Sequence, residues 1–229
     1  MMSASLLQSG IFISPTLRTR INELRKAIAA KETCLVVDWE KTIAETIGAN
    51  SMWELFNKET GENNNERLRR IKSIYTEDYA NLTIDDFLQW IEIVNIFYKE
   101  IKDKEKAFKE ISQKIRVFPD VFDFWNLFDP KKICIISCAI GEVIKLFLSK
   151  VENGKYKDVR IFANFITQKF DQTNSVFPRS KSDFLTRFIK ENNIDPAQVI
   201  VMGNSDVIDG GMFWPQTTNI FVTGDNYPR

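Results

Sequence analysis

The sequence predicts an α/β fold in which a parallel sheet is covered by helices and is interrupted by a helical insertion. After Phe118, short apolar runs alternate with amphipathic helical patterns, which is the order expected of a parallel sheet with connecting helices. Between Ile47 and Lys114, by contrast, the chain shows helical patterns and no strand-like run. We therefore expect a core domain made of residues 1–44 and 118–229, and a second domain made of residues 45–117.

The first predicted strand covers Cys34 to Val37. This run is short, apolar and rich in β-branched residues, which is typical of a fully buried strand. A helix is expected before it, because Ser14-Pro15 has the form of an N-cap followed by a first-turn proline. The strand stops abruptly at Asp38, and the carboxyl ends of strands in open α/β sheets form the edge where ligands bind.

The insertion is predicted to contain several helices. Ser51 to Glu54 fits a capping box, Glu66 to Tyr75 is a charged helical stretch, and a further helix begins near Thr83. The core elements expected after the insertion are helices over 121–127, 142–148 and 183–190, and strands over 133–137, 159–166, 199–202 and 220–222.

Composition excludes several classes of function. The chain has 229 residues, with 31 Lys and Arg against 31 Asp and Glu, so it lacks the basic field that binding to a nucleic acid polymer needs. No apolar run approaches the length of a membrane span. The chain contains no histidine, which removes His-based triads and most zinc hydrolases. The three cysteines suit neither a zinc site nor a disulfide framework, so we expect a cytoplasmic protein.

The stretch from Cys34 to Thr42, with Asp38-Trp39-Glu40-Lys41-Thr42 at its end, resembles the nucleophile motif of the haloacid dehalogenase superfamily of phosphatases. That motif is usually Asp-x-Asp-x-Thr, whereas the enolase-phosphatase branch carries Asp-x-Glu-x-Thr. Three later segments resemble the other motifs of the superfamily in the right order: the run ending at Ser137, the lysine Lys181 before a predicted helix, and the acidic loop that begins at Gly203.

The resemblance implies a Rossmann-like core, an inserted helical cap and hydrolysis of a small phosphorylated metabolite. In these roles Asp38 is the nucleophile, Glu40 is the general acid and base, and Ser137 and Lys181 hold the phosphoryl oxygens. Thr42 fixes the loop and is assigned, with Cys138, to substrate binding. Cys138 is not expected to be a nucleophile itself, because a Cys-x5-Arg loop would require arginine where the chain has Ile144.

The implied cofactor is Mg²⁺, held by the Asp38 carboxylate, the backbone carbonyl of Glu40 and a group of the last motif. Here the chain departs from the superfamily, because Asn204 stands where Asp is usual and the site has one negative charge fewer. Either Asp206 or Asp209 compensates. Spacing favours Asp209, and the sequence does not decide between them.

A longer resemblance points to one branch of the haloacid dehalogenase superfamily. Ile135 to Ile144 and Val159 to Phe165 are similar to segments of the cytosolic pyrimidine 5'-nucleotidases. We therefore expect a magnesium-dependent phosphohydrolase that acts on phosphate monoesters through an aspartyl-phosphate, with nucleoside 5'-monophosphates as the first candidate substrates. The alternatives are a phosphatase for a non-nucleotide metabolite, or a catalytically weakened protein that binds phosphorylated ligands or a partner.

Overall fold

The computed structural model describes residues 11–13, 26, 28, 32–45, 103–165, 174–206 and 208–222. Most of the predicted helical cap lies outside these residues, including the capping box at Ser51 and the helices expected at 66–75 and from Thr83. Most of the helix expected after Ser14 also lies outside them, although Lys26 and Ile28 are helical.

The centre of the fold is a six-stranded sheet in the order β1-β6-β5-β2-β3-β4. The strands are β1 (Ile11–Ile13), β2 (Cys34–Val37), β3 (Ile133–Ile140), β4 (Arg160–Asn164), β5 (Val199–Gly203) and β6 (Thr218–Val222). Strands β2 to β6 are parallel, as predicted, whereas β1 pairs with β6 in the antiparallel direction. Strand β1 was not predicted from the sequence, because a run of three residues is too short to show a periodic pattern.

Four α-helices flank this sheet among the described residues: α6 (Lys104–Lys114), α7 (Val121–Trp125), α8 (Gly141–Leu148) and α9 (Lys181–Glu191). Short 3-10 turns introduce β3 and β5, namely η2 (Pro130–Lys132) and η5 (Pro196–Gln198). Both turns begin at an aspartate, Asp129 or Asp195, whose side chain accepts a hydrogen bond from the backbone two residues later. Three more turns are η3 (Val151–Gly154), η4 (Pro178–Ser180) and η6 (Gly210–Met212).

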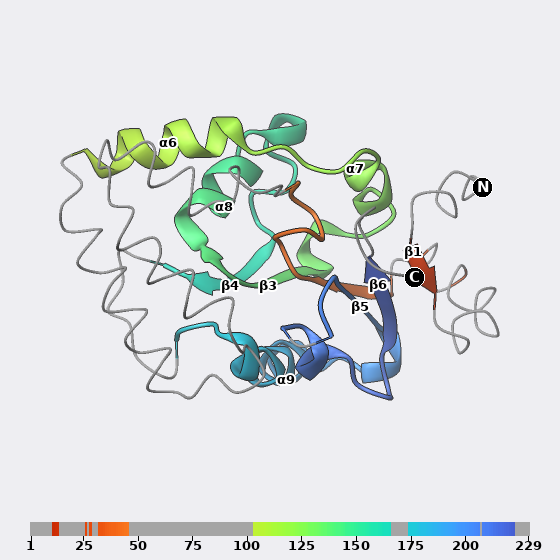
Figure 1. Cartoon of the computed structure of the whole chain (residues 1–229). Coiled ribbons are helices and arrows are strands. Elements are labelled where there is room, and N and C mark those ends of the chain that lie inside the picture. Colours follow the sequence, from red (N-terminus) through yellow and green to blue (C-terminus); the bar gives the residue numbers. More distant parts are fainter. Residues whose placement is uncertain are drawn as a thin grey trace.

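The two faces of the sheet are covered by different helices. Successive side chains of a strand point to opposite faces, so Leu35 and Val37 lie in one apolar cluster and Cys34 and Val36 in the other. Helices α6, α7 and α8 pack on the first face, and α9 packs on the second. Figure 1 shows this layering, with α9 on the side of the sheet opposite α8. Burial on both faces explains why the parallel strands are continuous apolar runs.

Helix α6 falls at the end of the range predicted as the cap. Its N-cap is Asp103, whose Oδ1 accepts a hydrogen bond of 3.0 Å from the backbone nitrogen of Lys106. Its buried side chains Phe108 and Ile111 join the same apolar cluster as α8. In Figure 1, α6 runs along the outer side of α8.

The strand order places the ends of β2 and β5 side by side. Strands β3 and β4 lie on one side of β2, and the next strands in the chain, β5 and β6, lie on its other side. A reversal of this kind creates a crevice at the carboxyl ends of the strands. The backbone nitrogen of Asp38 continues the pairing with a hydrogen bond of 2.9 Å to the carbonyl of Met202, so the segments after β2 and β5 start from a fixed register.

Candidate active site

A buried lysine joins two carboxylates at this crevice. Lys181 is the first residue of α9, and its Nζ lies 2.7 Å from Oδ1 of Asp38 and 2.6 Å from Oδ1 of Asp209. All three side chains are buried, with the Asp209 side chain 0% exposed. Charged groups are rarely buried unless they are paired. The fold therefore brings together three of the predicted site residues, from positions as far apart as 38 and 209.

Asp209 also orders the loop that follows β5. Its Oδ2 accepts hydrogen bonds from the backbone nitrogens of Asn204 and Ser205, at 2.9 and 3.0 Å. Asp206, the alternative acid, is exposed at the surface of the same loop. Gly203 makes this arrangement possible, because a Cβ atom at that position would lie 2.7 Å from Cβ of Asp209. In the tertiary structure Asp209 is therefore the buried acid of this loop, and Asp206 is the exposed one.

The loop after β2 reaches Asn204 through Thr42. The Thr42 hydroxyl lies 3.3 Å from Oδ1 of Asn204, and it donates the hydrogen bond because the amide oxygen is an acceptor. The loop turns tightly, since the backbone nitrogens of Ile43 and Ala44 both donate to the carbonyl of Trp39. Lys41 adopts a left-handed conformation, with φ of 59°. Glu40 is half-buried within this turn, and its backbone bridges to Ala44.

Ser137 and Cys138 lie inside β3, where the strand changes register. The pairing of β3 with β4 shifts between Ile136 and Ile140. Ser137 is buried, and its hydroxyl oxygen accepts a hydrogen bond of 3.2 Å from the backbone nitrogen of Ala139. The predicted strand ended at Ser137, whereas β3 continues to Ile140. Both residues belong to β3, the strand that pairs with β2, and Asp38 follows the end of β2.

Asn164 is hydrogen-bonded to the irregular part of β3, and its role was not predicted from the sequence. It is buried, and its Nδ2 donates to the carbonyls of Cys138 and Val176, both at 2.9 Å. Its Oδ1 accepts from the backbone nitrogen of Val176 at 2.9 Å. One side chain thus connects β4, the segment after Ser137 and the chain that leads to Lys181. The signal in the sequence was an amide directly after the apolar run Ile161 to Ala163.

Burial and the two acids set the electrostatics of the site. Burial raises the pKa of Asp38 to about 7, with a contribution from the charge of Asp209, while Lys181 opposes the rise. Burial alone would lower the pKa of Lys181, but Asp38 and Asp209 outweigh it and raise that pKa above its ordinary value. Burial likewise raises the pKa of the Cys138 thiol to about 12, with contributions from Asp38, Asp209 and Glu40. At neutral pH the lysine is therefore charged and the thiol is protonated.

The oxygen atoms at this edge fit a magnesium ion only in part. The described residues contain no group of three or more His, Cys, Asp or Glu side chains that could hold a metal. Both oxygens of Asp209 are already hydrogen-bonded within the protein. The remaining donors include the Asp38 carboxylate, the Asn204 amide oxygen and nearby backbone carbonyls. Hard oxygen donors of this kind suit Mg²⁺ when water completes the octahedron.

Comparison with solved structures identifies the fold. Cytosolic 5'-nucleotidase IIIB, in a structure bound to cytidine, matches with a TM-score of 0.61 and 14% identity over 94% of this chain and 80% of that chain. A haloacid dehalogenase family hydrolase from Salmonella enterica serovar Typhi matches with a TM-score of 0.53 and 14% identity, over 95% and 73% of the two chains. The chain has the haloacid dehalogenase fold.

A phosphoserine phosphatase, in a structure of a phospho-aspartyl intermediate analogue, shares the haloacid dehalogenase fold with a TM-score of 0.51 and 14% identity, over 81% of this chain and 83% of that chain. No protein-family model and no curated protein matches the sequence. Of the helices that the structure describes, none is long and apolar enough to cross a membrane.

Proposed function

We propose that this chain is a magnesium-dependent phosphohydrolase that acts on small phosphate monoesters through an aspartyl-phosphate. The observation that carries the proposal is the buried triad of Asp38, Lys181 and Asp209 at the reversal point of the sheet. An ordinary core avoids burying three ionisable groups, because their desolvation is costly. The haloacid dehalogenase fold supports the proposal, because known phosphatases and a nucleotidase share it.

The proposed reaction has two steps. Asp38 attacks the phosphorus, the ester P–O bond breaks, and Glu40 gives a proton to the leaving oxygen. Glu40 then takes a proton from water as the water oxygen attacks the phosphorus and releases phosphate and the Asp38 carboxylate. Ser137 and Lys181 hold the phosphoryl oxygens, and the lysine charge offsets the charge that develops there. A Mg²⁺ ion held by Asp38 and Asn204 would neutralise phosphate charge when bound.

Nucleoside 5'-monophosphates are the proposed substrate class. The support is the similarity of Ile135 to Ile144 and Val159 to Phe165 to pyrimidine 5'-nucleotidases, together with the structural match to a nucleotidase bound to cytidine. We propose that the predicted insertion over residues 45–117 forms the cap that selects the substrate, apart from α6, whose buried side chains pack with α8 in the core. A phosphate ester without a base is the alternative substrate, which the match to a phosphoserine phosphatase favours.

A second candidate is a weakened relative that binds phosphorylated ligands with little turnover. The specific observation in its favour is Asn204, an amide where the superfamily usually has an acid, next to Asp209, whose two oxygens are engaged by Lys181 and the loop backbone. A lost charge should weaken the metal site, and each 1.4 kcal/mol corresponds to about tenfold in affinity.

The deciding experiment measures phosphate release from a panel of nucleoside monophosphates and simple phosphate esters, with and without Mg²⁺. Wild type is compared with Asp38→Asn and with Asp123→Asn, a matched control because Asp123 is exposed on α7. Turnover that needs Mg²⁺, is lost in Asp38→Asn and is kept in Asp123→Asn would support the phosphatase. Absence of turnover on every ester, with a folded protein that binds Mg²⁺, would favour the binding protein.

A further inference from the structure

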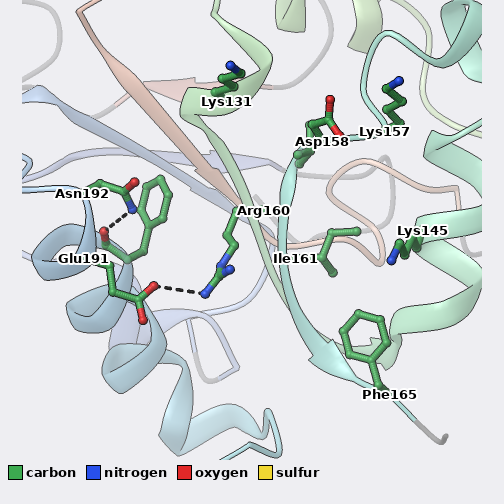
Figure 2. A pocket seen from close by; sticks show the side chains of 11 residues that line it. Lys131, Lys145, Lys157, Asp158, Arg160, Ile161, Phe165, Glu191 and Asn192 are labelled. Atoms are coloured by element: carbon green, nitrogen blue, oxygen red, sulfur yellow. Dashed lines mark hydrogen bonds and ion pairs between the residues drawn. The ribbon is translucent and has the colours of Figure 1, made fainter. Parts of the chain in front are cut away.

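A second pocket lies at the outer edge of β4, the last strand of the sheet. Its volume is about 550 Å³, and none of the residues of the Asp38 site lines it. Figure 2 shows that its side chains come from β4, from α8 and from the end of α9. We propose that this pocket binds a small molecule that carries a diphosphate or triphosphate group, at a site separate from the proposed active site.

The charge of the lining supports an anionic ligand. Four basic side chains line the pocket, namely Lys131, Lys145, Lys157 and Arg160, against the two carboxylates of Asp158 and Glu191. The whole chain, by comparison, has equal numbers of basic and acidic residues. The excess of positive charge is therefore local to the pocket. A concave surface with an excess of one sign of charge attracts ions of the opposite sign.

The three lysines are not neutralised by the acids that stand near them. Glu191 is held by two arginines, because its Oε2 lies 3.1 Å from NH2 of Arg160 and its Oε1 lies 2.7 Å from Nε of Arg187. Within the described part of the chain, none of the three lysine ammonium groups forms an ion pair. Each ammonium group is free to exchange water for a ligand oxygen.

The arrangement of the lysines favours a compact ligand. Lys131 belongs to η2, Lys145 to α8, and Lys157 precedes β4, so the three charges come from separate elements around one basin. Figure 2 shows Lys131 and Lys157 at the start of the strands and Lys145 beside Ile161. An extended acidic peptide would require charges spaced along a line. A diphosphate or triphosphate carries several charged oxygens that can meet long lysine side chains from different elements of the pocket lining.

The remaining lining offers an apolar surface for the rest of such a molecule. Ile161 and the ring of Phe165 are half-buried on the α8 side of β4, whereas Phe188 of α9 borders the pocket but is almost completely buried. The Phe165 ring is held closely, since a Cβ atom at Gly141 would lie 2.6 Å from it. The pocket volume falls within the range of about 300–1,000 Å³ that is usual for small-molecule sites.

The test is calorimetric titration of the full chain with tripolyphosphate, in EDTA and at low ionic strength. Without metal, the Asp38 site has one lysine that is already paired with two carboxylates, so it has no net positive charge to attract this probe. Wild type is compared with the double variant Lys145→Gln and Lys157→Gln, and with a control double variant, Lys109→Gln and Lys190→Gln. The control residues are exposed lysines outside the pocket. Thermal melting checks that each variant is folded, and the Lys145→Arg and Lys157→Arg double variant retains the charge.

We expect one binding site, at least about tenfold weaker binding in the pocket variant, and less than about twofold change in the control and in the arginine variant. Absence of binding by wild type would overturn the proposal, as would equal weakening in both glutamine variants. A hexaglutamate peptide is titrated in parallel. Tighter binding of the peptide than of tripolyphosphate would also overturn it, because the site would then prefer an acidic polypeptide.

Discussion

Lys181 and Asp209 form an ion pair of 2.6 Å in which both side chains are almost completely buried. The lysine is the first residue of α9, and the aspartate belongs to the loop after β5. The ion pair therefore connects a helix on one face of the sheet to the loop at the carboxyl end of β5. Asp38 shares the same ammonium group at 2.7 Å. Stability and chemistry at this site are therefore coupled, and several measurable consequences follow from the geometry.

Replacement of the lysine should destabilise the protein. Lys181→Met leaves two buried carboxylates without a cation, and removal of one partner of a buried pair costs about 3–5 kcal/mol. Lys190→Met changes an exposed lysine on the same helix and should alter the free energy of unfolding by less than about 0.5 kcal/mol. Urea denaturation at pH 8 measures both. Equal stability of the two variants would contradict the described burial of the triad.

A methyl group at Gly203 should disturb the Asp209 loop. Gly203→Ala puts a Cβ atom 2.7 Å from Cβ of Asp209, so either the loop or the strand end must move. The expected loss is about 1–3 kcal/mol of stability, as for other overpacked positions. Gly210→Ala is the matched control, because no atom lies within 4 Å of a Cβ placed there. Thermal melting that ranks the two variants in the opposite order would count against this packing.

Stability should depend on pH through Asp38. Its pKa of about 7 in the folded protein exceeds the ordinary value of 3.8, because burial and Asp209 disfavour the charged form. The folded state therefore binds more protons between about pH 4 and pH 7, and this group makes the protein less stable as pH rises through that window.

Asp38→Asn removes this contribution. In metal-free buffer, the free energy of unfolding of the variant relative to wild type should increase from pH 4 to pH 7 and then become constant. Each unit of pKa difference between the folded and unfolded states corresponds to about 1.4 kcal/mol. Urea denaturation at a series of pH values, with Asp123→Asn as the control, measures the difference. A difference that does not vary with pH would show that Asp38 is ionised throughout.

The cysteines should resist thiol reagents in the folded protein. All three are free and buried, and burial raises the pKa of each thiol, to about 12 for Cys138. The reactive species is the thiolate, so reaction at pH 8 should be slow until the protein unfolds. The accessible thiols are counted with a disulfide reagent that releases a light-absorbing product when it reacts with a thiol. Rapid labelling of one thiol in the native protein would disprove the described burial.

Asn164 should matter for stability and for the site. Asn164→Ala leaves the backbone groups of Cys138 and Val176 without their partners, and we expect a loss of about 2–4 kcal/mol. Gln198→Ala removes an exposed amide at the sheet's opposite end and serves as the control. If the proposed function holds, phosphate release should fall in the Asn164 variant and persist in the control. Unchanged stability would show that the three hydrogen bonds are not needed.

The sequence by itself determined the order of the elements after Phe118. Buried parallel strands are apolar on both faces, so β3, β4, β5 and β6 were visible as short runs, and α8 and α9 followed from helical spacing. The polar residues at the strand ends, Asp38 and Asn204, were visible for the same reason, since each interrupts an apolar run. Local pattern was sufficient for these features because each depends on near neighbours in the chain.

Only the tertiary structure decided which side chains meet. Strand β1 has three residues and forms by pairing with β6, about 200 residues later, so no local period marks it. The choice between Asp206 and Asp209 depends on which carboxylate reaches Lys181, and spacing in the loop left both open. Asn164 gains its partners from two other segments. Contacts of this kind depend on distances across the fold, which a linear pattern does not contain.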